Sequence, residues 1–318
     1  MSKNLIVVLA AYNGKKYLDE QLASIFGQQG TVSIKEVLLV DDCSSEDLDG
    51  FYSRLQKKYM NRLKIVRSRV NRGVVGTFEY GIDLALERGA DIVALSDQDD
   101  VWLPNKLSDS MALLPNEGVG LVYTDLSVVN EDLSLIAESK WKYSRTPPIS
   151  GSDSISLILK NPVSGCTCVM TKELAEAALP FPADIPMHDW WLALVASERG
   201  ALQYLDQPTM LYRQHSLNEV GGLPFGLKGF LARVKGGGGD LVTYLNNRLK
   251  NRVVLLSLIK RGAQEDKLID YYSSSFARRL LLSPWYLSVI YKEKEVLGFL
   301  NIFFESLLTI FTLRRLRR

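Results

Sequence analysis

ADIVALSDQDDVWLPNKL, the stretch at residues 90–107, decides the fold of this chain. Its apolar run at residues 92–95 leads, after one serine, into the three carboxylates of Asp97, Asp99 and Asp100. A short apolar run that ends in polar residues is typical of a buried strand, so the carboxylates should lie at one edge of a sheet. Two carboxylates two residues apart can hold a hard divalent cation through oxygen ligands.

A solvated acidic turn is the alternative interpretation of this cluster. Apolar residues flank the carboxylates on both sides, at 92–95 and at 101–104, which disfavours a fully solvated turn. Like charges held between apolar flanks repel one another. The pattern therefore favours a bound cation.

The first hundred residues alternate between strand patterns and helix patterns. Strands are expected at residues 5–11, 37–40, 63–66 and 92–95, and helices at 17–26, 48–59 and 78–86. This alternation predicts an α/β fold with parallel strands, right-handed crossovers and a ligand outside the carboxyl ends of the strands. Asp41 and Asp42 also follow a strand, so they should converge with the Asp97 cluster on one crevice. Ser44 or Ser45 is the expected cap of the second helix.

The rest of the chain shows further elements and then a change of character. Strands are expected at 119–129, 166–170 and 203–212, helices on either side of 166–170, and another helix from residue 188. Gly236 to Gly239 form a candidate joint, and the pattern after it is helical. The sequence thus predicts a domain at 1–225, made of the halves 1–105 and 106–225, followed by a basic helical region at 226–318.

Bulk composition narrows the class of protein. The chain has 318 residues, 47% of them hydrophobic and 23% charged, as expected of a folded protein with a sizeable core. The apolar run at the N-terminus is too short for a secretory leader and is interpreted as the first strand. Three cysteines cannot form a paired framework, so a reducing cytoplasmic compartment is expected.

The positive charge is concentrated at the C-terminal end. Residues 1–225 contain 21 lysines and arginines against 29 aspartates and glutamates, whereas residues 226–318 contain 17 against 7. The mostly apolar segment 296–313 includes Glu305 and precedes four arginines, a pattern that favours a helix lying in the membrane interface over a spanning helix. We expect a peripheral position on the inner face of the cell membrane, with packing against the domain as the alternative. No aromatic-basic recognition motif accompanies the charge, so no nucleic-acid partner is expected.

Two loops after strands could contact a nucleotide. Asp42 can accept a hydrogen bond from a pyrimidine N–H or a ribose hydroxyl, or can cap a helix instead. The loop of Asn71, Arg72 and Gly73 precedes a helix and could approach phosphates. No G-x-G-x-x-G follows a strand and no P-loop motif is present, so a dinucleotide cofactor is not expected.

A single candidate carboxylate lies at the predicted start of a helix. Asp189 could act as a general base, with His188, Trp190 and Trp191 forming the walls of an acceptor site, or could simply be a favourable charge at a helix N-terminus. Arg213 and His215, in the string Tyr-Arg-Gln-His at residues 212–215, could reach a pyrophosphate or a metal, or could be a surface pair at the end of a strand.

A zinc site that combines the two histidines of the chain with Cys166 and Cys168 is disfavoured. The C-x-C spacing lacks the usual C-x-x-C arrangement of such sites. The two cysteines are interpreted as buried strand residues.

Taken in order, five motifs resemble glycosyltransferase family 2. They are Ala11-Tyr12-Asn13-Gly14, Val40-Asp41-Asp42-x-Ser44, Asn71-x-Gly73, Ser96-Asp97-Gln98-Asp99-Asp100-Val101-Trp102 and His188-Asp189-Trp190. The longer strings S-D-Q-D-D-V-W-L-P-N-K-L, M-H-D-W-W-L-A-L and L-Y-R-Q-H look like bacterial rhamnosyltransferases of cell-wall or capsular polysaccharide synthesis. The resemblance runs over about residues 4–218.

The resemblance implies a GT-A fold, Rossmann-like with a mostly parallel sheet, and an inverting reaction. It implies that Asp42, with Ala11, Tyr12 and Asn13 beside it, contacts the donor nucleotide. It further implies Mg²⁺ or Mn²⁺ on Asp99, assisted by Asp97, with His215 as a metal or pyrophosphate contact. Asp189 would take the proton of the acceptor hydroxyl.

The expected reaction is therefore transfer of L-rhamnose from dTDP-L-rhamnose to a lipid-linked saccharide. The chain lacks the Q-x-x-R-W string of processive members, so addition of one sugar or a short run is expected. A UDP-hexose donor, a sugar nucleotidyltransferase and a non-catalytic nucleotide-sugar-binding scaffold are the alternatives. The first loop lacks the glycine-rich pattern of nucleotidyltransferases, and a scaffold has no need of a base. The sequence leaves the oligomeric state open.

Overall fold

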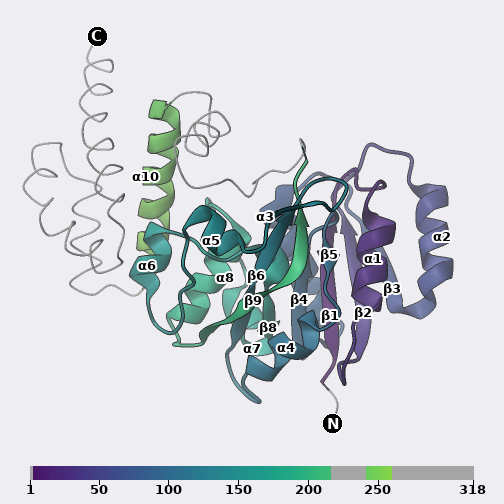
Figure 1. Ribbon diagram of the computed structural model, residues 1–318, viewed down its shortest axis with the longest axis horizontal. Helices are drawn as coiled ribbons and strands as arrows, with labels where there is room; N and C mark the ends of the chain where they lie inside the picture. Colours follow the sequence, from purple (N-terminus) through teal and green to yellow (C-terminus); the bar gives the residue numbers. More distant parts are fainter. Residues whose placement is uncertain (1–2, 216–240, 260–318) are drawn as a thin grey trace, which may run out of the picture. The chain divides into compact units, whose positions relative to one another are not determined.

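The computed structural model describes residues 3–215 and 241–259 (Figure 1). The chain divides into two compact units, Met1–Gly222 and Leu223–Arg318, and the described part of the second is the helix α10 (Leu241–Leu258). Among the described helices, none is both long and apolar enough to cross a membrane. The predicted joint at 236–239 and the segment 296–313 lie outside the described residues.

The first unit is an α/β domain built on one nine-stranded sheet. Its strands are β1 (Leu5–Ala11), β2 (Ile34–Asp41), β3 (Leu63–Arg67), β4 (Ile92–Ser96), β5 (Val101–Trp102), β6 (Leu121–Val129), β7 (Leu135–Ala137), β8 (Val169–Thr171) and β9 (Leu202–Arg213). Its helices are α1 (Leu18–Phe26), α2 (Asp49–Tyr59), α3 (Gly73–Glu87), α4 (Lys106–Leu113), α5 (Lys140–Ser144), α6 (Ser154–Leu159), α7 (Lys172–Ala178) and α8 (His188–Ser197). Single 3₁₀ turns lie at Met60–Arg62 and Gly165–Thr167.

The strand order is β3-β2-β1-β4-β8-β6-β9-β5, with β7 paired to β6. The first four strands are parallel, as the strand–helix alternation predicts. β8 runs antiparallel to both of its neighbours, whereas β6 and β9 are parallel to each other. The carboxyl ends of β1, β2 and β4 therefore meet at one edge, where the motif residues lie.

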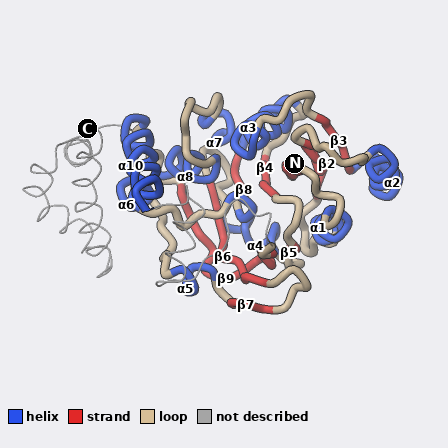
Figure 2. The backbone as a smooth tube through the Cα atoms, turned by 90° about the horizontal axis from the view of Figure 1, so that it is seen from above, coloured by secondary structure: helices blue, strands red, loops and turns tan. Residues whose placement is uncertain are grey.

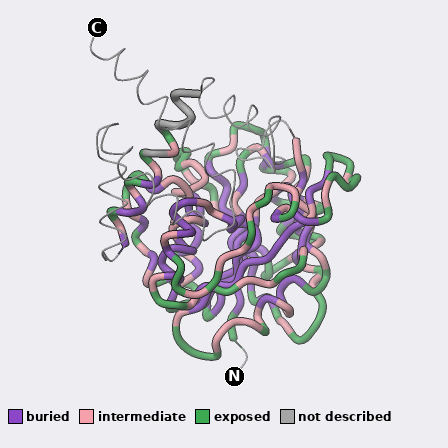
Figure 3. The backbone as a smooth tube through the Cα atoms, turned by 60° about the vertical axis from the view of Figure 1, so that its left-hand side comes forward, coloured by how far each residue is buried: buried purple, intermediate pink, exposed green. Residues whose placement is uncertain are grey.

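Helices cover both faces of the sheet, with α3, α7 and α8 on one side and α1 and α4 on the other (Figure 2). Buried residues concentrate along the strands of the sheet (purple in Figure 3), and most of them are apolar. Successive residues of a strand point to opposite faces, so Val7 and Leu9 pack in the same core cluster as Leu22 of α1 while Val8 points the other way. There Gly81 of α3 lets the helix approach closely, since a Cβ at Gly81 would collide with the Val8 side chain.

One strand prediction needs correction. Residues 166–170 were expected to form a strand, but β8 begins at Val169 and Gly165–Thr167 is a 3₁₀ turn. The turn is held by the bonds from Thr167 N to Ser164 O (2.8 Å) and from Cys168 N to Gly165 O (3.0 Å). Its backbone donors therefore have partners without a strand ladder.

Candidate active site

Two hydrogen bonds between the Tyr12 backbone and the Gln98 side chain join the loop after β1 to the acidic loop after β4, residues 97–100. Tyr12 N donates to Gln98 Oε1 (2.8 Å), and Gln98 Nε2 donates back to Tyr12 O (3.1 Å). A Cβ at Gly14 would collide with the Gln98 amide, so only glycine leaves room for it. The Ala-Tyr-Asn-Gly motif thus fixes the position of the Asp97 loop, a role for Gln98 that the sequence did not reveal.

Asn13 ties the loop after β1 to the loop after β2. Its backbone lies in the left-handed region (φ 50°), which asparagine tolerates better than most residues. Its Oδ1 accepts hydrogen bonds from Ser45 N (2.9 Å) and Glu46 N (3.2 Å), and its own N donates to Ser44 Oγ (2.8 Å). The expectation that Ser44 or Ser45 caps α2 is wrong: the cap position is Leu48, which makes no side-chain cap bond.

Asp42 is buried and already holds the N-terminus of α3. Its Oδ1 accepts from Arg72 N (2.7 Å) and its Oδ2 from Gly73 N (2.9 Å), while Asn71 Nδ2 donates to Asp42 O (3.2 Å). Gly73 has φ +67°, a conformation that glycine adopts without strain. The Asn-Arg-Gly loop is therefore shaped by Asp42. A carboxylate has about four acceptor positions, so a ligand donor can still share it.

Within the acidic loop, Asp99 pairs with a histidine. Asp99 Oδ2 lies 2.8 Å from His215 Nε2, and both side chains are largely buried. The His215 ring stacks on Tyr17, with 5.0 Å between the ring centroids. The structure thus brings together Asp99 and His215, which are 116 residues apart in the sequence.

Arg213, at the end of β9, donates two hydrogen bonds to this loop. Its Nε donates to Asp99 O (2.9 Å) and its backbone N to Asp100 Oδ1 (3.3 Å). Its guanidinium also bonds Glu131 O and the Glu20 carboxylate. With only 4% of its side chain exposed, Arg213 positions the loop from the interior of the domain.

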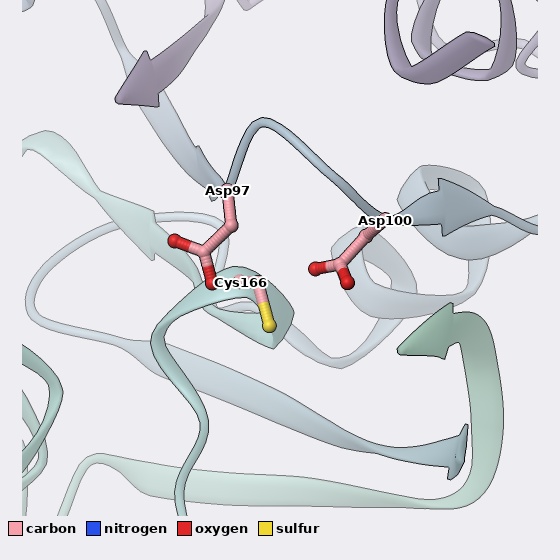
Figure 4. A group of neighbouring side chains, drawn as sticks. All are labelled: Asp97, Asp100 and Cys166. Atoms are coloured by element: carbon pink, nitrogen blue, oxygen red, sulfur yellow. The ribbon is translucent and has the colours of Figure 1, made fainter. Parts of the chain in front are cut away.

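Asp97 lies with Asp100 and Cys166 (Figure 4). Asp100 is 1% exposed, and its Oδ2 has no hydrogen-bond partner among the described residues. Burial, and then the charges of Asp99 and Asp97, raise the pKa of Asp100 well above its usual value. Burial and the Asp100 charge likewise raise the pKa of the Cys166 thiol.

Lys106 lies under this cluster at the start of α4. Its side chain is fully buried, its ammonium is 5.0 Å from the centroid of the Trp102 ring, and within residues 3–215 and 241–259 it has no hydrogen-bond partner. Burial lowers the pKa of Lys106 to about 8, against the opposing effect of nearby Cys166 and Asp100. This buried cation could not be predicted, because a lysine in a helical pattern is normally exposed.

Asp189 lies in the first turn of α8, in a buried environment. It is 8% exposed, its Oδ1 accepts from Asn161 Nδ2 (3.0 Å) and its Oδ2 from Gly165 N (3.0 Å). Burial raises its pKa from 3.8 to about 6, although nearby Lys140 and these hydrogen bonds lower it. A carboxyl group with a pKa close to neutral is suited to proton transfer at physiological pH.

The aromatic neighbours of Asp189 are engaged by the protein itself. Trp190 Nε1 donates to Leu157 O (2.7 Å), and Trp191 Nε1 donates to Ala178 O (2.9 Å). His188 is buried against Phe78, 4.0 Å between ring centroids, and burial lowers its pKa to about 3. Neither indole N–H is thus free for a sugar hydroxyl, and His188 faces the interior.

The cysteines form no disulfide: all three are free, Cys43 at the surface and Cys166 and Cys168 in the interior. Among the described residues, the group of side chains around Cys166 that could hold a metal ion consists of Cys166, Asp97 and Asp100, and it contains neither histidine. The buried position expected of Cys166 and Cys168 is confirmed, but neither lies in a strand: Cys166 belongs to the 3₁₀ turn, and Cys168 follows that turn and precedes β8.

The sequence profile of Glycosyl transferase family 2 matches residues 6–176, more than half of the chain. The chain belongs to glycosyltransferase family 2. Its activity is therefore that of a glycosyltransferase, and the residues matched include the loops after β1, β2 and β4 described above.

Two curated relatives show the range of donors. The dTDP-rhamnosyl transferase RfbG of Shigella flexneri is 29% identical over 223 residues, 67% of this chain and 73% of RfbG. The UDP-Glc:alpha-D-GlcNAc-diphosphoundecaprenol beta-1,3-glucosyltransferase WfgD of Escherichia coli is 22% identical over 191 residues, 59% of this chain and 67% of WfgD. The match spans 73% of RfbG and 58% of another curated relative, a Mycobacterium bovis protein that is 25% identical over 214 residues.

Solved structures show the same GT-A fold. Staphylococcus aureus TarS 1-349 in complex with UDP-GlcNAc superposes with a TM-score of 0.56 at 18% identity, over 85% of this chain and 71% of TarS. The mannosyltransferase PcManGT of Pyrobaculum calidifontis, in complex with GDP-Man and Mn²⁺, gives a TM-score of 0.50 at 17% identity, over 98% of this chain and 86% of PcManGT. At these identities the likeness concerns the fold alone.

Proposed function

We propose that this chain is an inverting, metal-dependent glycosyltransferase that moves L-rhamnose from dTDP-L-rhamnose to a lipid-linked saccharide in cell-wall or capsular polysaccharide synthesis. The observation that carries the chemistry is Asp189, a buried carboxylate with a pKa near 6 that is oriented by two hydrogen-bond donors. The donor assignment rests on the dTDP-rhamnosyl transferase relative.

In the proposed reaction, Asp189 is the general base. Its carboxylate takes the proton from an acceptor hydroxyl while the hydroxyl oxygen attacks the anomeric carbon, and the bond from that carbon to the diphosphate breaks. Attack on the face opposite the leaving group inverts the configuration. Asn161 and Gly165 fix the direction of the carboxylate, which keeps it within reach of the hydroxyl. His188, Trp190 and Trp191 are proposed to shape the acceptor side, the tryptophans through ring faces because their N–H groups are bonded to the backbone.

Asp97, Asp99 and His215 are the proposed ligands of Mg²⁺ or Mn²⁺. Carboxylate oxygens suit these ions, and Asp99 and His215 are already adjacent. The cation would neutralise charge on the diphosphate leaving group. Asp99 requires a fixed loop for this role, and Arg213 and Gln98 supply its supports.

The proposed donor site is the rim formed by Ala11, Tyr12, Asn13, Asp42, Asn71, Arg72 and Gly73. Tyr12 is 47% exposed at this rim, so its ring is available to a nucleotide base. The buried Asp42 carboxylate would accept from the base or ribose in addition to its two backbone donors. Arg72 stacks on Tyr80, 4.5 Å from its guanidinium carbon to the ring centroid, and would meet a phosphate from that position.

The test is donor binding followed by transfer. Melting temperatures are measured with dTDP-rhamnose, UDP-glucose, UDP-galactose and UDP-GlcNAc, each with Mn²⁺ and with EDTA. A ligand at 100 times its Kd adds about 2.7 kcal/mol to the free energy of unfolding, enough for a clear shift. A shift with dTDP-rhamnose that requires Mn²⁺ supports the proposal. A folded sample that binds a donor but never releases nucleotide diphosphate with any acceptor would identify a scaffold.

A UDP-hexose donor is the second candidate, favoured by the WfgD relative. The two donors share the diphosphate and a pyrimidine base, so the same rim serves both. A Mn²⁺-dependent shift with UDP-glucose and none with dTDP-rhamnose would select it.

We further propose the division into a catalytic domain at 1–225, with donor half 1–105 and acceptor half 106–225, and a basic membrane-associating region at 226–318. The excess of lysine and arginine in that region favours an anionic lipid surface, where the lipid-linked acceptor resides. Deletion of residues 296–318 should release the protein from vesicles that contain anionic lipid. Equal sedimentation of the full and shortened chains would reject the anchor.

A further inference from the structure

Three ligand atoms converge beside the Asp99–His215 pair without including either residue. One carboxylate oxygen each of Asp97 and Asp100 and the sulfur of Cys166 all lie within 4.8 Å of one another. Metal–sulfur and metal–oxygen bonds of about 2.3 and 2.1 Å place two ligand atoms of a tetrahedral ion about 3.6 Å apart. Small rotations of the three side chains would therefore let them contact one ion. In Figure 4 they point toward a common space.

An unsatisfied oxygen lies within this group. Asp100 Oδ1 accepts from Arg213 N (3.3 Å), but Oδ2 has no hydrogen-bond partner among the described residues. A buried carboxylate oxygen without a donor is costly in a folded protein. Asp100 is 1% exposed and Cys166 2%, whereas Asp97 is half-buried and gives access from solvent.

We propose that Asp97, Asp100 and Cys166 form a binding site for one thiophilic divalent cation, of the Zn²⁺ or Co²⁺ type. Thiolate sulfur favours such ions over Mg²⁺, whereas carboxylates alone favour the hard ions. The position is separate from the cation proposed for catalysis, but Asp97 can contribute to both because it has two carboxylate oxygens. Binding converts the Cys166 thiol to a thiolate and releases its proton to solvent.

The local charges suit a divalent ion. With the thiolate formed, the three ligands carry three negative charges, and the buried Lys106 ammonium beside Cys166 and Asp100 offsets one of them. The remaining two negative charges match one divalent cation. Lys106 Nζ makes no hydrogen bond within the described part of the chain and lies against Trp102, so it does not occupy the ligand oxygens.

The test is absorption spectroscopy of the full chain with Co²⁺. A thiolate bound to Co²⁺ gives an intense charge-transfer band in the near ultraviolet, which carboxylates and imidazoles do not give. We expect a band that saturates at one equivalent, is displaced by Zn²⁺ and is lost in Cys166→Ser. Cys168→Ser, a buried thiol two residues away, and Cys43→Ser, an exposed thiol, are the matched controls and should keep the band. No band in the unmodified protein, or a band that survives Cys166→Ser, overturns the proposal.

A second variant keeps the test informative if Cys166→Ser does not fold. Asp100→Asn keeps the size of the side chain and removes one anionic ligand, and we expect it to weaken Co²⁺ binding at least tenfold while the Cys166 thiol remains present. Unchanged affinity in a folded Asp100→Asn sample would also overturn the site. Sugar transfer with Mg²⁺ is measured on the same unmodified protein. Transfer without a band rejects only this site, whereas a band without transfer rejects only the proposed function.

Discussion

Replacement of Asp189 by asparagine tests the proposed base with almost no change in shape. The side chain is 8% exposed and receives one hydrogen bond on each oxygen, from Asn161 Nδ2 and Gly165 N, both at 3.0 Å. Asparagine keeps one acceptor oxygen, but its NH₂ group must face one of these two donors. The variant therefore loses the basic group and one hydrogen bond while the helix start is retained.

The effect on rate should be much larger than the effect on stability. A positioned general base contributes about 10²- to 10⁴-fold, so kcat should fall by that factor while donor binding persists. The pKa of about 6 in place of 3.8 corresponds to about 3 kcal/mol of cost for the buried charge. The mismatched donor in the asparagine variant costs about 1 to 3 kcal/mol. At pH 8 the two terms oppose each other, so the variant should be as stable as the unmodified protein or up to about 2 kcal/mol more stable.

The ionisation of Asp189 makes both the stability and the activity of the protein depend on pH, in opposite directions. The folded protein holds the Asp189 proton up to about pH 6, whereas the unfolded chain loses it near pH 3.8, so the charge penalty is absent below pH 3.8 and complete above pH 6. The stability of the unmodified protein should therefore decline across this window relative to Asp189→Asn. Activity has the opposite trend, because only the ionised carboxylate is a base: kcat/KM should rise through pH 6.

The assay combines initial rates of nucleotide diphosphate release from pH 5 to 9 with chemical denaturation at pH 5 and pH 8. Asp184→Asn is the matched control, since Asp184 is an exposed aspartate five residues away and should give unmodified rates. A folded Asp189→Asn protein with normal kcat would refute the assignment of the base. An acid limb that persists unchanged in that variant would show that another group is responsible for it.

Three further changes test the supports of the site. Asn161→Ala removes a donor that favours ionised Asp189, so the acid limb of kcat/KM should move to higher pH; an unmoved limb would deny that Asn161 tunes the base. Asp99→Ala should abolish transfer and make donor thermal shifts indifferent to Mn²⁺, and an active Mn²⁺-dependent variant would remove Asp99 from the metal site. Arg213→Lys keeps the charge but cannot reproduce the bond from Nε to Asp99 O, so we expect a loss of about 1 to 3 kcal/mol in urea unfolding and weaker Mn²⁺ binding; unchanged values of both would show that this bond does not position the loop.

The first half of the domain could be predicted because its signals are local. The runs at 5–11 and 92–95 are short, apolar and bounded by polar residues, and the structure has β1 and β4 at Leu5–Ala11 and Ile92–Ser96. Parallel strands with helical crossovers then bring their carboxyl ends to one edge by topology alone. The place of the acidic loop followed from these facts without any side-chain detail.

The partners of the site residues could not be predicted, because they come from distant parts of the chain. Tyr12 and Gln98 are 86 residues apart, and Arg213 and Glu20 are 193 apart. The preference of serine for helix caps is also overridden in this fold, since the Ser44 hydroxyl is hydrogen-bonded to Asn13 N and to the Asp41 carboxylate. A weak local preference of about 1 kcal/mol is easily outweighed by such tertiary bonds.

The acidic loop shows most clearly where spacing stops being informative. A D-x-D pattern suggests that Asp97 and Asp99 face the same way, as they would in an extended strand. The chain turns after β4, however, and the turn places Asp99 against His215 while Asp97 and Asp100 face Cys166. Adjacent carboxylates thereby acquire different partners, one with an imidazole and one with a thiol. Substitution of Asp99 and of Asp100 should therefore affect different cations, a separation that motif matching alone would never suggest.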